Sequence, residues 1–429
     1  MEDHPVSDTI GDADAEYALD LVRKICAEVG PGLPATPQER QRAAIIKGEL
    51  EGHLGAENVA MEEFTLAPRA CLASYPLSAL LMLAAALLNI ATGRVPGASP
   101  WLTAVPSLAF SLVAPLLYVL ESVLGFELID PFFKQKQSVN VVGALRKPGT
   151  TSVNRLLILS GHHDSAPENT WLHSLGYGML FLSITHVLGF ATLLVMSAIQ
   201  LAGVIAGSPE TVRLGTIGWV LLVFPIVPSV VYAAFFNMGW KNGGTVPGAA
   251  DNLSASALAV AMCRFLANNP SCIPEQTEIR FVSFGSEEVG LRGSRRYVER
   301  HLEELRRLET RVLNFETVAY PEITILTSDV NGTVKNDPEA VRSAVAAADR
   351  AGVPYNVRAA ILGVGSDAAP FTRARLSATT LLPFKVPQQL VAFYHQDRDT
   401  PDVLTIEPLL NVLKLTLEWV RAGGEQATH

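Results

Sequence analysis

The sequence predicts an α/β domain with a helix-flanked mixed sheet, interrupted by two pairs of membrane-spanning helices. Three observations support this prediction. Short apolar runs typical of strands end at His, Asp or Glu, helical patterns lie between these runs, and four long stretches contain no Asp, Glu, Lys or Arg. An α/β sheet explains the first two observations, because such sheets present ligands at the carboxyl ends of parallel strands. Membrane helices explain the third, because a span needs about 20 apolar residues.

Potential metal ligands follow the predicted strands. LLILSG ends at His162, IRFVSFGS ends at Glu287 and Glu288, and RVLNF ends at Glu316. Asp251 lies in the small-residue segment VPGAADNLSASA, just ahead of a predicted helix, and a late histidine lies in FYHQDRDTPD. Imidazole combined with carboxylates suits zinc, and two metals that share a carboxylate lie about 3.5–4 Å apart. The set therefore predicts a divalent metal site.

The composition narrows the class of protein. The 429 residues carry a formal charge of −9 and a mean hydropathy of +0.26, which is high for a soluble enzyme. No basic cluster is present, so no nucleic-acid partner is expected. The four cysteines form no Cys-x-x-Cys pair and are predicted to be free thiols. The acidic opening lacks the basic and apolar regions of a signal peptide.

The uncharged stretches are Cys71–Gly93, Val95–Leu120, Trp171–Pro209 and Leu214–Trp240. Each is long enough to span a bilayer, and the connectors within each pair are short. Buried core helices are the alternative, but four uncharged runs of this length are rare in a soluble α/β domain. We expect His186, inside the third stretch, to hydrogen-bond between helices, although an ionisable group within a membrane merits a test of function.

The catalytic domain is consequently discontinuous. We expect its three parts at residues 1–70, 123–171 and 241–429, with transmembrane hairpins at 71–122 and 172–240. Removing the hairpins leaves about 310 residues, a reasonable size for one α/β domain.

Local signals place several elements. Thr36 can cap a helix in which Pro37 fits the first turn and Glu39 occupies the capping-box position. Strands are predicted at 59–66, 138–148, 278–283 and 311–315. Helices are predicted at 14–30, 254–268, 295–308, 338–351 and 409–421.

Five motifs together resemble the zinc aminopeptidase family that includes glutamate carboxypeptidase, glutaminyl cyclase and the catalytically dead transferrin receptor. That family shows His-x-Asp-Ser, Gly-Ala-x-Asp-Asn-x-Ser, Glu-Glu-x-Gly-Leu-x-Gly-Ser, an acidic residue after a strand, and a late His followed by Asp-Thr. All five occur in this chain in that order, in GHHDS, GAADNLS, EEVGLRGS, after RVLNF, and in YHQDRDT. GVGSDAAPF also resembles the family's Ser-Asp-x-x-Pro-Phe loop.

The resemblance implies a zinc-aminopeptidase-like fold and two zinc ions, with other divalent metals as alternatives. One ion takes His162, Asp251 and Glu316. The other takes Asp251, Glu288 and His395, so that Asp251 bridges the two ions.

The resemblance also implies catalytic roles. Glu287 is the general base for a metal-activated water, and Asp164 orients His162 as a carboxylate behind the ligand. We expect His163 to be structural. One departure matters: most active relatives carry Asp where this chain has Glu316, and the longer side chain leaves room for a one-metal enzyme.

Three functions compete. The first is a membrane-bound aminopeptidase that removes amino-terminal residues from peptides. The second is a one-zinc enzyme resembling glutaminyl cyclase, and the third is a non-enzymatic membrane receptor or scaffold on the same fold. The third requires the loss of ligands, yet every ligand position in this chain holds a competent side chain and Glu287 is present.

Orientation is predicted from the positive-inside rule. Four Lys or Arg residues lie near membrane ends on the catalytic side and two lie in the connectors, which favours a cytoplasmic catalytic domain, whereas many relatives are exported. These residues are Arg69, Lys134, Lys136 and Lys241 against Arg94 and Arg213.

The second hairpin is expected to keep the site near the bilayer. This hairpin begins about ten residues after His162 and ends about ten residues before Asp251. Ten residues span at most about 35 Å, so both ligands are tethered to membrane ends. We therefore expect peptide substrates that are apolar or emerge from the lipid.

Overall fold

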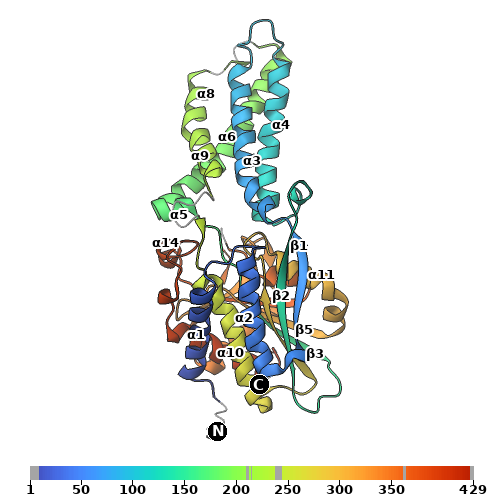
Figure 1. The fold of residues 1–429 in the computed structure, drawn as a ribbon. Coiled ribbons are helices and arrows are strands. Elements are labelled where there is room, and N and C mark those ends of the chain that lie inside the picture. Colours follow the sequence, from blue (N-terminus) through green and yellow to red (C-terminus); the bar gives the residue numbers. More distant parts are fainter. Residues whose placement is uncertain (1–8, 209–211, 214, 237–243, 361–363, 426–429) are drawn as a thin grey trace. The chain divides into compact units, whose positions relative to one another are not determined.

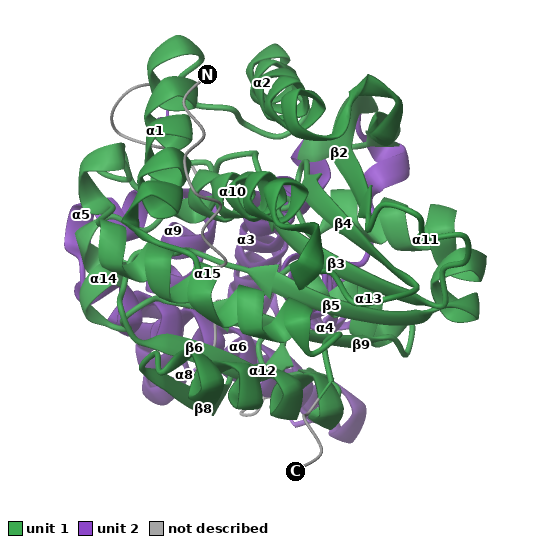
Figure 2. Ribbon diagram, turned by 90° about the horizontal axis from the view of Figure 1, so that it is seen from below, with its two compact units in different colours: residues 1–68, 135–167, 245–429 green, residues 69–134, 168–244 purple. Residues whose placement is uncertain are grey.

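A computed structural model of the protein shows two compact units that are each assembled from separate stretches of chain. We call residues 1–68, 135–167 and 245–429 the sheet unit, and residues 69–134 and 168–244 the helical unit (Figure 2). The structure describes residues 9–208, 212–213, 215–236, 244–360 and 364–425. Some residues of the predicted segments lie outside these ranges. They are Pro209 of the third uncharged stretch, Leu214 and residues 237–240 of the fourth, Lys241 beside it, and Gly363 of the GVGSDAAPF loop.

The sheet unit contains a nine-stranded mixed sheet, which confirms the predicted fold class. The spatial order is β1-β2-β4-β3-β5-β9-β6-β7, with β8 paired to β6. The central strands β4, β3, β5 and β9 run parallel to one another, whereas β2 is antiparallel to both β1 and β4. The strands are β1 (Val59–Leu66), β2 (Lys136–Arg146), β3 (Arg155–His162), β4 (Thr277–Phe284), β5 (Glu309–Phe315), β6 (Ile323–Asp329), β7 (Val334–Lys335), β8 (Tyr355–Ala359) and β9 (Ser377–Leu382).

Helices cover both faces of this sheet, because the central strands are apolar on both sides. In β3, Leu157 and Leu159 pack into one core and Leu156 and Ile158 into the other, as the alternation of side chains along a strand requires. The first core holds α1 (Asp12–Glu28), α2 (Pro37–Leu54), α10 (Ser254–Asn268), α12 (Pro338–Ala351) and α15 (Ile406–Arg421). The second holds α11 (Arg292–Arg307) and α13 (Ala368–Arg373).

The start of α2 agrees with the sequence in part. Thr36 accepts a hydrogen bond from the Glu39 amide at 3.3 Å, and Pro37 occupies the first turn. The predicted capping box is wrong, because the Glu39 carboxylate does not bond the Thr36 amide. That carboxylate is almost fully buried and bonds residues that are distant in the sequence.

The helical unit contains four helices long and apolar enough to cross a membrane, at Pro68–Ala91, Trp101–Val123, Gly178–Ala206 and Thr216–Ala234 (Figure 1). The second predicted stretch becomes helical only at Trp101, because two prolines and a glycine precede it. The third stretch is divided: α5 (Thr170–Leu175) ends at Gly176, whose φ of 52° is left-handed, and α6 (Gly178–Ala206) follows. The other helical elements in these stretches are α3 (Pro68–Ala91), α4 (Trp101–Leu117), η2 (Tyr118–Val123), η3 (Asp130–Phe132), α8 (Thr216–Leu221), η4 (Leu222–Ile226) and α9 (Val227–Ala234). The sheet unit also contains α14 (Gln388–Ala392) and short helical turns at Ala56–Asn58, Ala249–Leu253, Pro270–Cys272 and Pro401–Val403.

Polar side chains of the helical unit point inward. Ser197 on α6 lies 2.7 Å from Ser111 and receives a hydrogen bond from Asn89 at 2.9 Å, while His186 lies 2.8 Å from Ser229 on α9. Large apolar side chains are exposed along the same helices. Polar groups bonded between helices and apolar groups turned outward are the pattern that a lipid environment favours. His186 makes the interhelical contact predicted for it. The most exposed apolar side chains include Leu80, Leu102, Phe181, Val187, Ile205, Ile217 and Phe224.

Candidate metal centre

The central strands bring three predicted site segments to one edge of the sheet. His162 is the last residue of β3, the Glu287–Glu288 turn follows β4, and Glu316 comes directly after β5. Since β3 lies between β4 and β5 and is parallel to both, the three carboxyl ends are neighbours. The sheet topology, not proximity in sequence, therefore assembles this part of the site.

Asp251 reaches the same place from the segment Ala249–Leu253, just ahead of α10. The next residue, Asn252, fixes this segment beside Glu316: its Nδ2 donates to the Phe315 carbonyl at 3.1 Å, and its Oδ1 accepts from the Thr317 amide at 3.1 Å. The Asp251–Asn252 peptide bond is cis.

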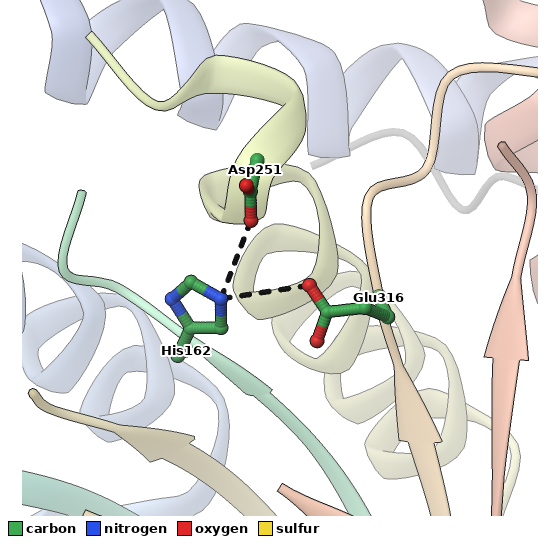
Figure 3. A group of neighbouring side chains, drawn as sticks. All are labelled: His162, Asp251 and Glu316. Carbon is green, nitrogen blue, oxygen red and sulfur yellow. Dashed lines mark ion pairs between the residues drawn. The ribbon is translucent and has the colours of Figure 1, made fainter. Parts of the chain in front are cut away.

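His162 faces three carboxylates. Its Nε2 lies 3.4 Å from Asp251 Oδ1, 3.6 Å from Glu316 Oε1 and 3.6 Å from Glu287 Oε2. In Figure 3, dashed lines join one nitrogen of this imidazole to the carboxylates of Asp251 and Glu316. The structure thus brings together the three residues expected to hold one metal ion.

His395 faces the other side of Asp251. Its Nε2 lies 3.0 Å from Asp251 Oδ2 and 3.3 Å from Glu288 Oε2. The two oxygens of Asp251 thus face different histidines, and two groups of potential ligands share this carboxylate. Within each group, His162–Asp251–Glu316 and Asp251–Glu288–His395, the donor atoms lie within 4.8 Å of one another.

The residues present fit divalent cations. Four buried ligand atoms have no hydrogen-bond partner among the described residues: Nε2 of His162, Oδ2 of Asp251, Oε1 of Glu288 and Oε2 of Glu316. Buried polar atoms are rarely left without a partner, so four such atoms in two convergent groups favour bound cations. Imidazole nitrogen and carboxylate oxygen are ligands that zinc accepts.

The electrostatics of the centre point the same way. Burial raises the pKa of Glu316 to about 8. Burial, together with the carboxylates of Glu316 and Asp367, raises the pKa of Glu287 well above its ordinary value. Burial also opposes ionisation of Asp251, but the imidazoles of His162 and His395 beside its carboxylate lower its pKa below the ordinary range. Carboxylates thus outnumber the imidazoles, and divalent cations would neutralise the excess negative charge.

Asp164 supports the ligands from behind. Its Oδ1 lies 3.3 Å from Nδ1 of His162, as expected for a carboxylate that orients this ring. Its two oxygens also accept the backbone N–H groups of Glu287 and Glu288, both at 3.1 Å. One fully buried side chain therefore touches three of the predicted site residues.

Asp399 has a similar position that the sequence did not identify. Its carboxylate accepts the amides of Ala250 at 2.7 Å and Asp251 at 3.0 Å, and burial raises its pKa to about 8. Asp399 lies in the HQDRDT segment, where the Asp-Thr pair helped to identify His395 but did not itself indicate a role for Asp399. Asp367, in the GVGSDAAPF loop, is a second fully buried carboxylate whose charge acts on Glu287.

His163 stays outside the ligand groups. It is fully buried, and its Nδ1 lies 2.8 Å from the Ser283 hydroxyl of β4. The structural role expected for it is consistent with this contact.

Comparison with known proteins finds a likeness over the carboxy-terminal half of the chain. Residues 235–420 match the model of peptidase family M28. This segment contains Asp251, Glu287, Glu288, Glu316 and His395. Aminopeptidase YwaD of Bacillus subtilis (strain 168) is 31% identical over 166 residues, which make up 38% of this chain and 35% of that protein. The chain thus matches about a third of the length of this curated relative.

Solved structures extend the likeness to almost the whole chain at the level of fold. An aminopeptidase from Aneurinibacillus sp. strain AM-1 has a TM-score of 0.54 at 15% identity, with 98% of each chain covered. A glutaminyl cyclase from an Acidobacteriales bacterium has a TM-score of 0.53 at 12% identity, with 99% of each chain covered. This chain therefore shares the fold of an aminopeptidase and of a glutaminyl cyclase, as the resemblance in sequence implied.

Proposed function

We propose that this protein is a membrane-bound zinc aminopeptidase that hydrolyses the first peptide bond of peptides. The carboxylate of Asp251, which faces His162 with one oxygen and His395 with the other, carries this proposal. It supports a pair of metal ions held by a shared ligand. Glu287 lies beside the pair and belongs to neither group that shares Asp251, so it is available for proton transfer.

The proposed ligands are those of the two groups. His162 and Glu316 would hold one ion, Glu288 and His395 the other, and Asp251 both. We propose zinc, and other divalent ions suit the same donors. When bound, the metal supplies a Lewis acid that polarises the scissile carbonyl and lowers the pKa of water.

Glu287 is proposed to move the proton. In this reaction the carboxylate takes a proton from the attacking water, the water oxygen bonds to the carbonyl carbon, the carbon–nitrogen bond breaks, and the proton passes to the departing nitrogen. Asp164 keeps the Glu287 backbone in place through its hydrogen bond to the amide.

The membrane is the second part of the proposal. The length and apolarity of the four helices, with their inward polar and outward apolar side chains, support a multi-pass integral membrane protein. The count of Lys and Arg near the predicted membrane ends supports a cytoplasmic sheet unit. His162 lies a few residues before the segment 168–244, and Asp251 lies a few residues after it. From this sequence separation alone, we propose a site that serves peptides at the bilayer surface.

A panel of aminoacyl reporter substrates tests the activity. The purified protein should release the reporter from free aminoacyl compounds and should fail on their amino-acetylated counterparts, because an aminopeptidase requires a free amino terminus. Metal content measured on the same sample should approach two ions per chain. One tightly bound ion at saturation, together with cyclisation of amino-terminal Gln, would instead establish the one-zinc cyclase. Hydrolysis of neither substrate set by metal-loaded protein would favour the receptor or scaffold.

A further inference from the structure

Helix α2 carries two buried charged side chains that point toward the metal centre. They are Glu39 and Arg42, three residues apart and therefore on the same face of the helix. We propose that Glu39 and Arg42 are positioning residues, which hold the backbone of the loops that carry the base and the metal ligands. The proposal rests on the proposed peptidase function, and it also predicts zinc affinity, which can be measured without catalysis.

Glu39 is bonded to the residue next to the proposed base. Its Oε1 accepts a hydrogen bond from the Ser286 hydroxyl at 2.7 Å. Its Oε2 accepts from the Ser138 hydroxyl at 2.9 Å and from the Ala35 amide at 2.8 Å. One carboxylate thus ties the turn before Glu287 to β2 and to the start of α2. Glu39 is 1% exposed, so water does not compete for these bonds.

The turn that Glu39 holds has an unusual backbone and little room. Ser286 adopts a left-handed φ of 55°, which is uncommon for a residue with a side chain. A Cβ on the preceding Gly285 would lie 2.4 Å from the Val139 carbonyl oxygen and 3.2 Å from Glu39 Oε1. The backbone therefore passes directly against β2 and α2 on its way to Glu287. A shift of the Ser286 hydroxyl would be transmitted to Glu287 and Glu288, which follow it in the chain.

Arg42 joins two further site segments. Its Nη1 donates to the His163 carbonyl at 3.1 Å, and its Nη2 donates to the Pro247 carbonyl at 2.6 Å. Its Nε donates to the Gly30 carbonyl at 2.9 Å. His163 lies between the ligand His162 and its partner Asp164, and Pro247 lies shortly before Asp251 in the chain. The guanidinium is fully buried, and no shorter side chain can reach these carbonyls together.

Arg42 also brings charge to the centre. Burial lowers its pKa to about 10, so the guanidinium stays protonated at neutral pH. The carboxylates of Asp164 and Asp399 stabilise that charge. These are the same carboxylates that accept the amides of Glu287, Glu288 and Asp251. Arg42 therefore offsets part of the negative charge that holds the ligands, in addition to fixing the backbone.

The helix supplies the rigidity that the role requires. The Thr36 cap and Pro37 fix its start, and α2 packs against both α10 and β2. A pair of side chains projecting from one packed helix can hold three loops in a common frame, which neither residue could do alone.

Glu39→Ala and Glu39→Gln test the first half of the proposal on the full chain. At saturating zinc, Glu39→Ala should lower kcat by about 10- to 100-fold with KM within about 2-fold, because misplaced supporting groups cost this much at metal sites. Zinc affinity, measured by chelator competition, should fall by a similar factor. Glu39→Gln keeps an oxygen that can accept the Ala35 amide and adds a nitrogen that can donate to the Ser286 hydroxyl, so it should restore most of both quantities. Glu51→Ala is the matched control, because Glu51 on the same helix pairs only locally with Lys47.

Arg42→Met and Arg42→Lys test the second half. Arg42→Met should weaken zinc binding by about 10- to 100-fold. Arg42→Lys keeps the charge without the three-way fork, so it should recover only part of this loss. The control is Arg40→Met on the same helix, because Arg40 is half exposed and pairs at the surface with Glu63.

The outcomes separate the two proposals. If Glu39→Ala and Arg42→Met lower the melting temperature but leave zinc affinity and kcat at wild-type values, the positioning role is wrong and the residues are merely structural. If Glu39→Ala does not fold, Ser286→Ala removes the same hydrogen bond from the other side and must show the loss of kcat and zinc affinity. If the wild-type protein hydrolyses no peptide, the peptidase proposal fails, while the zinc titrations still decide this one.

Discussion

The backbone amide of Asp251 donates a hydrogen bond to the Asp399 carboxylate across 3.0 Å. The same carboxylate accepts the amide of Ala250, so it holds two consecutive backbone amides at the proposed shared ligand. Asp399 itself belongs to neither of the two groups of potential ligands that share Asp251. Its effect on the metals is indirect, and it can be measured.

Asp399→Asn should weaken zinc binding by about 10- to 100-fold. The amide nitrogen that replaces one oxygen is a donor, and it cannot accept the backbone N–H that the oxygen accepted. Chelator competition measures the affinity. Asp402→Asn, an exposed substitution in the same segment, should bind zinc as the wild type does. Equal affinity in the two variants would mean that the grip on Asp251 is unimportant.

Glu287→Gln should retain metal and lose at least roughly 100-fold in kcat, the scale of general-base catalysis. Glutamine keeps the size and hydrogen-bonding capacity of the side chain but does not take up the proton. Glu288→Gln is the comparison, because Glu288 belongs to a ligand group and its loss should reduce metal affinity. Near-normal turnover by Glu287→Gln would assign the base elsewhere.

Removing the metal should abolish hydrolysis reversibly. Dialysis against a chelator is expected to eliminate activity, and added zinc should restore it. Asp251→Ala should remain inactive after zinc is added back, because both groups lose their shared carboxylate. Metal analysis before and after each step distinguishes loss of the ion from loss of the protein. Full activity of the chelated, metal-free protein would contradict a metallopeptidase.

Glu316→Asp should weaken one metal site selectively. Glu316 Oε1 lies 3.6 Å from His162 Nε2, and the shorter aspartate would withdraw its carboxylate from that ring. We expect a zinc titration with two well-separated affinities in the variant, the weaker one reduced at least about 10-fold. If both affinities match those of the wild type, the extra methylene of Glu316 is not needed for its carboxylate to reach the metal.

The proposed surface location of the site predicts a lipid effect on turnover. Peptides with apolar amino-terminal residues that partition into lipid should be hydrolysed faster by protein in nanodiscs than by protein in detergent. Polar peptides should show no such difference, and they serve as the internal control. Equal ratios for the two classes of peptide would leave the helices as an anchor only.

The proposed ligands could be picked out from the sequence because each follows a strand or lies within a short motif. His162, Glu316 and the Glu287–Glu288 pair stand where an apolar run ends, and parallel pairing then brings such ends together. Asp251 and His395 needed the motif order as well, since both reach the centre on irregular segments. Local sequence was sufficient to identify the side chains that the structure brings together in the two groups.

The supporting residues could not be recognised in the same way. Glu39 occupies a position that a capping box explains equally well, while its true partners Ser138 and Ser286 are 99 and 247 residues away. Arg42 donates hydrogen bonds to backbone carbonyls. Because every residue type has a backbone carbonyl, the accepting residues cannot be recognised from their side chains. Similarly, the apolar stretch from Trp171 continues through the break between α5 and α6, because hydropathy does not register the left-handed turn at Gly176. Long-range hydrogen bonding and backbone conformation are tertiary properties.

The discontinuity of the sheet unit sets an order of events during synthesis. Strand β3 ends at His162, whereas both of its neighbours, β4 and β5, are encoded after residues 168–244. When the ribosome has made β3, this apolar strand has neither pairing partner, and four of the five proposed ligands do not yet exist. The sheet can close, and zinc can be captured, only after the helical unit has been translated. Metal binding at the proposed site would therefore come late in the synthesis of the chain, after residues 168–244 have been translated.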